Sequence, residues 1–496
     1  MTFFPERCRL WVPNMRRALA PAVLLALVSF SLGGTPIRLD VPPGLQPAWE
    51  RLVFRHPLPQ DLSSGSIILR EGRQAGFRVV ESAVLVPVMR MWETPVTLTR
   101  AQAESGGVRL RPLDSVELPD IALPVDGLFP GDSGYPLVKL ISVGIGDDDA
   151  ALRAWFESLP DLPVGGDVER ILWIGAVGDV MPARGVDAAL IAPDGLRRVF
   201  GDVLPVLQGF DFLAGNLEAA ATTGGTRAVK SYTFRFDPRA LARLSAAGFS
   251  YLSAANNHTF DFGSRGFLDT LENLEHAGIA TSGAGSTAAG ASRPAVLRIG
   301  ATEVRLLSFA AYPADRTGFD GRIIARAGAD RPGELWLDDD GIAAATRAFS
   351  PDAFNIALVH GGVEWSTIPT EDQKRRYRDL VRAGADLVIG SHPHLLQGLE
   401  ARDGRLIAYS LGNFLFPGMD GTPGGERSLV LAVGIFGRRI VSLRTVAVRL
   451  SAGTVRRDQR PGALQEFRSL TGRLNGGVPR NDASGVQWTE SKRSGE

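Results

Sequence analysis

A chain of 496 residues is longer than one hydrophobic core usually organises, so we expect two or three domains. Its 54 basic and 54 acidic residues balance, which excludes recruitment of nucleic acid by an overall positive field. Apolar residues at 44% and charged residues at 22% are typical of a globular protein.

Residues 1–34 have the layout of an export signal. Arginines at positions 7, 9, 16 and 17 precede the apolar run Ala18–Leu32, which is shorter than the roughly 20 residues that span a bilayer comfortably. We therefore expect an exported, extracytoplasmic protein in the periplasm or at the cell surface. Cleavage would give a secreted chain and retention an N-terminal membrane anchor; both remain open. The lone cysteine, Cys8, precedes the run, so a cleaved chain would contain no thiol ligand.

Residues 35–166 are predicted to form a smaller α/β domain followed by a linker. Short β-type runs such as Ser66–Leu69 and Ala83–Val86 are separated by Gly, Pro and Asp turn signals. The segments 121–130 and 134–137 resemble a truncated solute-binding-type module. Only His56 is present and no ligands cluster, so a structural or interaction role is favoured over solute binding.

From residue 167 to residue 450, apolar strands alternate with helices, as in an α/β domain. The run Ile171–Val177 is uniformly apolar, which is typical of a strand covered on both faces. Asp237 and Pro238 predict a helix start, and Gly248 predicts its end. Another helix is expected to stop at Gly278.

Residues 451–496 are polar and glycine-rich, and we expect a poorly ordered tail.

Six predicted strands end in side chains that can bind a metal or a phosphate. These are Asp179, Asn216 with Glu218, Asn257 with His258, His360, His392 with His394, and Asn413. In layered α/β folds the ligand crevice lies beyond the carboxyl ends of the strands. Four of the five histidines beyond the linker occur at these ends, which independent structural use would rarely produce. We therefore expect one shared metal site.

The predicted donors are carboxylate and amide oxygens and imidazole nitrogens, without thiolate. This set suits divalent Mn, Fe, Zn, Ni or Mg, and the number of donors indicates two ions. Two neighbouring ions can activate water and hold the oxygens of a phosphoryl group. His258 is then free to protonate a leaving group, with Asp261 as the partner of its ring.

The strand-end motifs together resemble a known family. They are Gly178-Asp179-Val180-Met181, Gly215-Asn216-Leu217-Glu218, Ala255-Asn256-Asn257-His258, His360-Gly361-Gly362 with Glu364, Gly390-Ser391-His392-Pro393-His394, and Tyr409-Ser410-Leu411-Gly412-Asn413-Phe414. Over about residues 170–450 the chain resembles the bacterial capsule-synthesis or poly-γ-glutamate-synthesis proteins, which are similar to calcineurin-like metallophosphoesterases. The resemblance implies a four-layer fold in which helices flank a β-sandwich, with two metals at the strand ends.

The resemblance also implies roles for individual residues. Metal ligands are expected at Asp179, Glu218, Asn257, His360, His392 and His394; the catalytic pair at His258 and Asp261; and substrate contacts at Arg184, Asn216, Glu364 and Asn413. Met181 departs from the Asp-x-His motif of the phosphoesterases, so one ion would lack a nitrogen ligand. Gly361 stands where the narrower family has Trp. These departures bear on the metal count and the phosphatase activity more than on the fold.

Two functions follow from these expectations. The first is an exported metal-dependent phosphoesterase-like hydrolase in the synthesis or export of capsule or poly-γ-glutamate. The alternative keeps the fold but makes the chain a non-catalytic component that binds or exports the polymer. Either function implies an anionic surface polymer or its precursor as a partner, together with a membrane biosynthesis or export complex.

Overall fold

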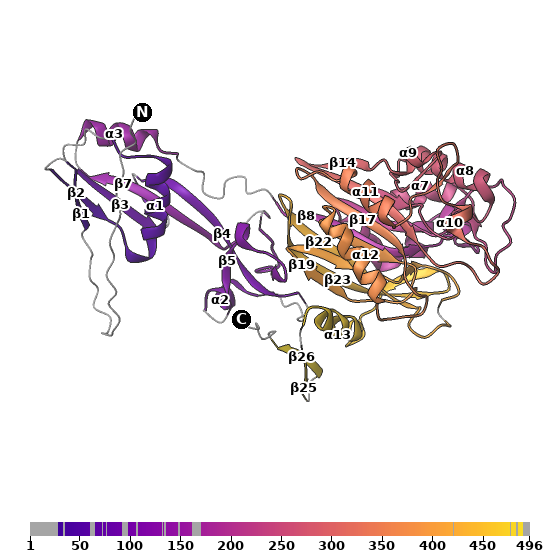
Figure 1. Ribbon diagram of the computed structural model, residues 1–496. Coiled ribbons are helices and arrows are strands. Elements are labelled where there is room, and N and C mark those ends of the chain that lie inside the picture. Colours follow the sequence, from indigo (N-terminus) through magenta and orange to yellow (C-terminus); the bar gives the residue numbers. More distant parts are fainter. Residues whose placement is uncertain are drawn as a thin grey trace, which may run out of the picture. The chain divides into compact units, whose positions relative to one another are not determined.

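The computed structural model describes residues 28–32, 35–59, 65–71, 73–75, 77–91, 98–105, 108–130, 132, 135–146, 149–160, 170–419, 421–476, 478–482 and 485–489. The arginine-bearing segment and the first part of the apolar run, which predict the export signal, lie outside these ranges. Within the ranges, no helix is both long and apolar enough to cross a membrane. The chain divides into two compact units, Met1–Ala83 with Val138–Gly166, and Val84–Leu137 with Asp167–Glu496 (Figure 1).

The first unit combines a sheet with two helices. Its strands are β1 (Val28–Leu32), β2 (Thr35–Asp40), β3 (Gly65–Glu71), the beginning of β4 (Arg78–Arg90) and β7 (Val138–Gly146). Strand β3 runs parallel to β2 and antiparallel to β7. Helices α1 (Gln46–Arg55) and α3 (Ala150–Ser158) bury Trp49 and Trp155 in a core with Ile67 and Val143. Burial of these two indole rings stabilises the unit.

Residues 84–137 pack with the larger unit, not with the 35–166 domain in which the sequence grouped them. They contain α2 (Arg100–Glu104), β5 (Leu110–Pro112) and β6 (Asp120–Ala122). Val86 and Ala122 share a core cluster with Ile171 and Val441. The hydroxyl of Ser442 also donates to the Ala122 carbonyl oxygen at 2.9 Å. The grouping by sequence differs because the residues that bury this segment come much later in the chain.

Two sheets form most of the second unit. The first has the order β12–β9–β8–β22–β23–β24, and β21 also pairs with β8. Its strands are β8 (Leu172–Val180), β9 (Phe212–Leu217), β12 (Tyr251–Ser253), β21 (Asn413–Leu415), β22 (Arg427–Phe436), β23 (Arg439–Ser451) and β24 (Thr454–Arg457). The second has the order β14–β15–β17–β18–β20–β19. Its strands are β14 (Ala295–Ile299), β15 (Thr302–Ala311), β17 (Phe354–Gly361), β18 (Leu387–Ser391), β19 (Leu399–Arg402) and β20 (Arg405–Ala408).

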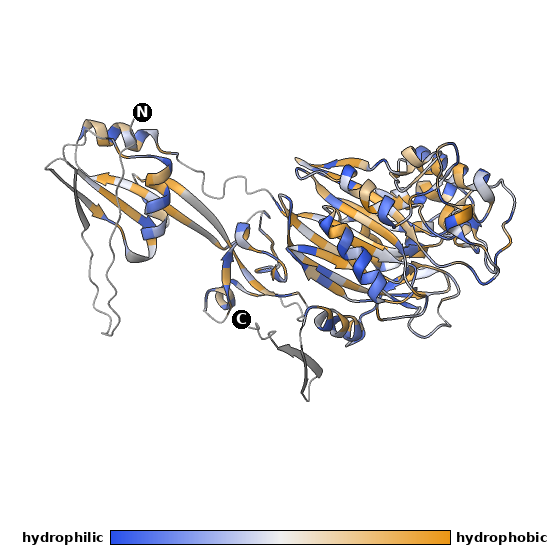
Figure 2. Cartoon of the chain, in the orientation of Figure 1, coloured by the Kyte–Doolittle hydropathy of each residue, from blue (hydrophilic) through white to orange (hydrophobic). Residues whose placement is uncertain are grey.

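Alternate side chains of each sheet face different cores, as the pleat of a strand requires. Ile174 and Ala176 of β8 lie in one apolar cluster with Ile356 and Leu358 of β17, so this cluster lies between the two sheets. Val177 of β8 faces the opposite way, into a second cluster. Figure 2 shows the apolar colouring along these strands. The sheets are therefore buried on both faces, in agreement with the uniformly apolar strand predicted at 171–177.

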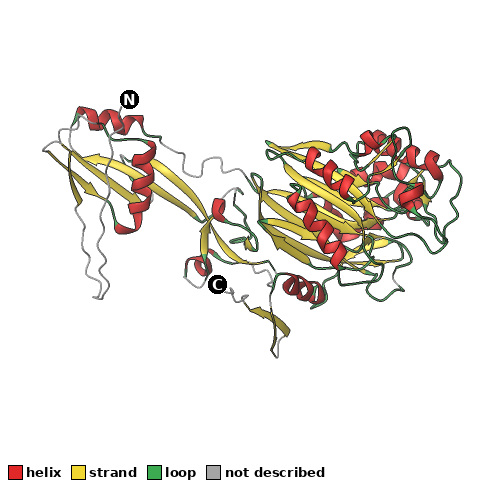
Figure 3. Ribbon diagram, in the orientation of Figure 1, coloured by secondary structure: helices red, strands yellow, loops and turns green. Residues whose placement is uncertain are grey.

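Helices cover the outer faces of the two sheets (Figure 3). The cluster that contains Val177 receives side chains from α4 (Val186–Ile191), α5 (Gly195–Phe200), α6 (Leu204–Gln208), α7 (Arg239–Ala246) and α8 (Gly263–His276). On the other sheet, α11 (Asp339–Ala348) and α12 (Glu371–Arg382) bury Ala345 and Leu380 against Phe309 and Val388. The smaller elements are α9 (Ala288–Ala291), α10 (Gly321–Ile324), β10 (Ala220–Ala221), β11 (Arg235–Phe236), β13 (Ala284–Gly285) and β16 (Gly333–Glu334).

The two helix boundaries predicted from glycines are confirmed. Helix α7 begins just after Pro238 and ends two residues before Gly248, whose φ is +113°. Helix α8 ends just before Gly278, whose φ is +70°. In both cases glycine supplies a left-handed conformation that other residues adopt only with strain.

The expectation of a poorly ordered tail from residue 451 is wrong for its first part. Strand β24 pairs with β23, and α13 (Gln465–Leu474) buries Phe467 and Leu470. Phe467 joins the cluster between the two sheets. The tail is polar overall, so its few buried apolar side chains do not stand out in the composition. Further along, β25 (Val478–Asp482) pairs with β26 (Gly485–Thr489).

Candidate metal centre

Parallel strands bring the predicted ligands to one edge of the two sheets. In the first sheet Asp179 of β8 is in register with Asn216 of β9, and Asn413 of β21 pairs with Asp179. In the second sheet His360 of β17 is in register with Ser391 of β18, one residue before His392. The amide of His392 donates to Asp179 Oδ2 at 3.3 Å, which links the two sheets. The structure therefore brings strand-end residues of the two sheets together.

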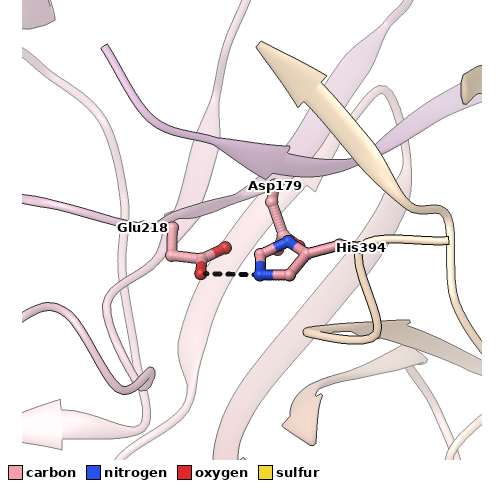
Figure 4. Close-up of side chains that lie close together, drawn as sticks. All are labelled: Asp179, Glu218 and His394. Carbon is pink, nitrogen blue, oxygen red and sulfur yellow. Dashed lines mark ion pairs between the residues drawn. The ribbon is translucent and has the colours of Figure 1, made fainter. Parts of the chain in front are cut away.

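One group of donor atoms consists of Asp179, Glu218 and His394. One ligand atom from each lies within 4.8 Å of the others (Figure 4). His394 Nδ1 is 3.6 Å from Asp179 Oδ2, and His394 Nε2 is 3.9 Å from Glu218 Oε1. All three side chains are buried. We call these residues the carboxylate group.

A second group consists of Asn257, His360 and His392. His360 Nε2 lies 2.8 Å from Asn257 Oδ1 and 3.1 Å from His392 Nδ1. We call these residues the imidazole group. The two groups adjoin, because His360 Nε2 is 4.0 Å from Glu218 Oε1 and His360 Nδ1 is 3.7 Å from Asp179 Oδ1.

Several buried polar atoms of both groups lack a partner. Neither oxygen of Glu218, nor Nε2 of His392, has a hydrogen-bond partner among the residues described. A buried polar atom left unpaired costs about 1–3 kcal/mol, so native proteins retain few of them. The unpaired atoms point to a cation, because carboxylate oxygen and imidazole nitrogen are its usual ligands. The residues present thus fit a divalent metal.

The electrostatics of the metal-free cluster agree with this fit. Burial, together with the charge of Asp179, raises the pKa of Glu218 well above its usual value. Burial also raises the pKa of Asp179, against the lowering effect of His394. Burial lowers the pKa of His392 to about 3 and that of His360 well below its usual value. The imidazoles of His392 and His360 are therefore neutral at pH 7, the form that binds metal.

The loop that carries His392 and His394 has an unusual backbone. His392 has φ +98° and His394 has φ +59°, on either side of Pro393. Left-handed conformations at non-glycine residues cost of order 1–3 kcal/mol each and persist only where the surroundings impose them. The side chain of Asn413 contributes to this restraint, since its Nδ2 donates to the His394 carbonyl oxygen at 3.1 Å. Its Oδ1 lies 2.8 Å from His394 Nδ1. Backbone strain here aims both imidazoles at the cluster.

His258 and Asp261 lie together beside the carboxylate group. His258 Nδ1 is 2.7 Å from Asp261 Oδ2, and His258 Nε2 is 3.9 Å from Glu218 Oε1. Burial lowers the pKa of His258, and the Asp261 carboxylate partly offsets this effect. Asp261 therefore fixes the ring so that Nε2 faces the site.

The predicted substrate contacts take up different positions. Asn216 is buried, and its Nδ2 donates to Asp179 Oδ1 at 2.8 Å, so it orients the carboxylate of Asp179. Asn413 likewise positions His394. Arg184 is exposed, and its guanidinium carbon lies 4.7 Å from the centre of the Phe234 ring. Glu364 is exposed and forms no hydrogen bond or ion pair within the described part of the chain. Direct substrate contact by any of the four remains a prediction.

Met181 occupies the place of the missing histidine. Its side chain is buried in the apolar cluster beneath the first sheet, and its amide donates to the Leu415 carbonyl oxygen at 2.6 Å. It therefore contributes packing rather than a nitrogen ligand.

Sequence reasoning missed three residues that shape the site. Lys230 donates to Asp261 Oδ1 at 2.5 Å and also to the Asn257 carbonyl oxygen. Asn256 Nδ2 donates to Asn216 Oδ1 at 3.2 Å, and the Phe234 ring lies 4.3 Å from that of His258. Lys230 left one signal, because it is one of only four lysines among the 54 basic residues. Asn256 stands in the motif Ala255-Asn256-Asn257-His258, although no role is predicted for it there, and Phe234 carries no signal in the sequence.

Comparisons with known proteins place the same region in a family. Residues 173–418 match the family model described as bacterial capsule synthesis protein PGA_cap. The PGA biosynthesis protein CapA of Bacillus subtilis is 29% identical over 252 residues, which cover 50% of this chain and 64% of that protein. The capsule biosynthesis protein CapA of Bacillus anthracis is 30% identical over 251 residues, covering 48% of this chain and 58% of that protein.

The chain thus spans less than two thirds of the length of these relatives. A solved structure of a hypothetical protein from Thermus thermophilus overlaps with a TM-score of 0.36 at 15% identity, covering 56% of this chain and 100% of that chain. A likeness of this size supports no conclusion. Residues 173–418 of this chain thus match the bacterial capsule synthesis protein PGA_cap family.

Proposed function

We propose that this protein is an exported, metal-dependent phosphoesterase-like hydrolase in the synthesis or export of an anionic capsule polymer such as poly-γ-glutamate. The observation that carries the proposal is the pair of buried carboxylates, Asp179 and Glu218, with both Glu218 oxygens unpaired among the described residues and His258 alongside. Two sheets with helices on their outer faces agree with the four-layer fold of the metallophosphoesterases.

The proposed chemistry divides between the cation site and His258. Divalent ions held by the carboxylate and imidazole groups would acidify water and neutralise charge on a phosphoryl oxygen. Asp261 orients His258 so that Nε2 can pass a proton to the leaving oxygen. Lys230 balances the charge of Asp261 and limits how strongly that carboxylate favours imidazolium. The buried setting strengthens each of these interactions.

A role in polymer assembly is supported by the relatives. Both bacillary proteins are named for capsule or PGA biosynthesis, and the family model matches residues 173–418, which contain the candidate metal centre. We propose that this chain likewise acts on an anionic polymer or its precursor within a membrane-associated complex.

The arginine-bearing apolar N-terminus supports export to the periplasm or cell surface. Fractionation of the native host with an antibody against the chain tests this, and a purely cytoplasmic signal would contradict it.

The direct test of catalysis is metal reconstitution. Protein stripped with a chelator and refilled with Mn²⁺ or Zn²⁺ should hydrolyse a generic phosphodiester or phosphomonoester, and the Glu218→Gln variant should not. Arg347→Gln is a matched control, because Arg347 is exposed on α11 and forms no ion pair with the residues described. Lack of metal-dependent turnover with every substrate would contradict the proposal.

Met181 favours a second function, a non-catalytic component that binds or exports the polymer. Its burial leaves the carboxylate group with one histidine. Elemental analysis separates the two functions. Two tightly bound transition ions per chain favour hydrolysis, whereas no bound metal, with folding unchanged in the His392→Ala plus His394→Ala variant, favours the non-catalytic component.

A further inference from the structure

A positively charged hollow lies beside the metal centre. Its volume is about 580 Å³, and its lining includes Arg184, Arg227, Thr233, Phe234, Arg235 and Phe262. No acidic residue belongs to the described lining. We call this feature the arginine hollow.

The three guanidinium groups of the hollow have donors to spare. Arg184 Nη1 donates to the Pro417 carbonyl oxygen at 3.0 Å, and Arg227 Nε donates to Thr233 Oγ1 at 2.7 Å. Arg235 lies with its guanidinium carbon 4.6 Å from the centre of the Phe262 ring. All three arginines are exposed, and none forms an ion pair with a carboxylate in the described ranges. Each guanidinium has five N–H donors, so most of them face solvent.

A single ring separates the hollow from the proposed proton donor. The Phe234 ring lies 4.3 Å from the ring of His258 and 4.7 Å from the guanidinium carbon of Arg184. The amide of Phe234 donates to Asp261 Oδ2 at 2.6 Å. A ligand in the hollow would thus lie next to the centre that we propose to react.

The loop that forms one side of the hollow is fixed to the segment that carries His258. Gly225 has φ +82°, and a Cβ at this position would lie 2.2 Å from the Phe262 carbonyl oxygen. The amide of Ala228 donates to the Asp261 carbonyl oxygen at 2.8 Å. The hollow and the catalytic pair therefore share one framework, and glycine permits their close approach.

We infer that the arginine hollow binds anionic groups along a polymer chain whose reacting bond lies at the metal centre. Guanidinium groups pair with carboxylates through two parallel hydrogen bonds, and three of them around a space of about 580 Å³ suit several anionic groups better than a single one. The ligand class is a carboxylate-bearing chain. That this ligand is the capsule polymer rests on the proposed function.

Direct binding tests the inference without any need for turnover. The full-length, metal-loaded protein is titrated with a fluorescently labelled oligo-γ-glutamate, in parallel with labelled inorganic polyphosphate and neutral polyglutamine. Substitutions of glutamine for Arg184, Arg227 and Arg235 are made singly and together, with Arg347→Gln as the control. We expect each single change to weaken oligoglutamate binding roughly threefold to tenfold, and Arg347→Gln to leave it unchanged.

Further outcomes define where the inference fails. Added NaCl should weaken wild-type binding and should affect the triple variant much less. Equal binding by the wild type and the triple variant, or equal losses in the Arg347→Gln control, would overturn the inference, as would binding of polyphosphate alone. Metal content measured on each variant shows whether the fold and the metal centre are intact. If the wild type binds oligoglutamate through these arginines but hydrolyses nothing, the proposed catalysis is wrong. Binding of the polymer by the arginine hollow would still be supported.

Discussion

Lys230 and Asp261 form an ion pair in the interior of the protein. Lys230 Nζ lies 2.5 Å from Asp261 Oδ1, and the two side chains are 3% and 0% exposed. The other carboxylate oxygen of Asp261 contacts His258. A charge that has been removed from water depends strongly on its partner, so loss of either residue leaves the other uncompensated.

Replacement of Lys230 is therefore expected to destabilise the protein. The Lys230→Met variant should lose about 3–5 kcal/mol of unfolding free energy, measured by urea titration, because Asp261 becomes a buried unpaired charge. The added change Asp261→Asn should recover part of this loss. Lys374→Met is the control, since Lys374 pairs with Glu371, which is 86% exposed, and should change stability by less than about 1 kcal/mol. Equal effects of the Lys230 and Lys374 changes would contradict burial of the pair.

Removal of the proposed proton donor should reduce the rate without emptying the site. His258→Gln is expected to lower kcat about 10²–10⁴-fold on a phosphodiester, the usual contribution of general acid catalysis. Asp261→Asn should cost less, because the imidazole remains but is less well oriented. Metal content, measured by elemental analysis, should stay at the wild-type level in both variants. A simultaneous loss of metal would instead assign His258 to coordination.

The two donor groups predict separable losses of metal. His394→Ala should prevent binding of an ion by the carboxylate group, and His392→Ala binding by the imidazole group, so each variant should bind one ion fewer than the wild type. Excess metal should stabilise the stripped wild type by about 2.7 kcal/mol per site at a free concentration of 100 Kd. Thermal unfolding monitored during metal titration measures this. Complete loss of metal from both variants would mean that the groups share one ion.

Glu218 should give the metal-free protein a distinctive pH dependence. Burial raises the pKa of Glu218 in the folded state, so the folded protein binds a proton that the unfolded chain releases at about pH 4.3. Its contribution to stability is present below that pH and falls as pH rises toward the folded pKa. In chelator, the stability advantage of wild type over Glu218→Gln should therefore shrink as pH rises above about 4.3. Urea titrations at several pH values measure the difference in unfolding free energy between the two proteins. A difference that stays constant with pH would contradict the raised pKa of Glu218.

The strand ends could be predicted because apolar runs and their polar termini are local patterns. Asp179, Asn257 and His392 were identified in this way, and the structure brings them to one edge. Their division into two donor groups could not be predicted, because it depends on the register between strands and on the backbone at His392 and His394. Lys230 lies on a loop, and only tertiary packing converts an ordinary lysine into a buried partner of Asp261.

The remaining differences concern segments whose apolar partners are distant in sequence. Val86 is buried with Val441, and Phe467 with the cluster between the sheets. Neither pairing has a local signature, so sequence reasoning grouped residues 84–137 with the smaller domain and treated the chain after residue 451 as a tail.

The contact between the His392 amide and Asp179 Oδ2 joins positions 213 residues apart. Bringing positions of such separation together costs loop-closure entropy, which the packing of the two sheets must offset. The ion-binding cluster therefore does not exist until both sheets have joined, and no partial intermediate can capture the ion with its full ligand set. Any ion that this cluster binds would then be selected from those available in the compartment where folding is completed.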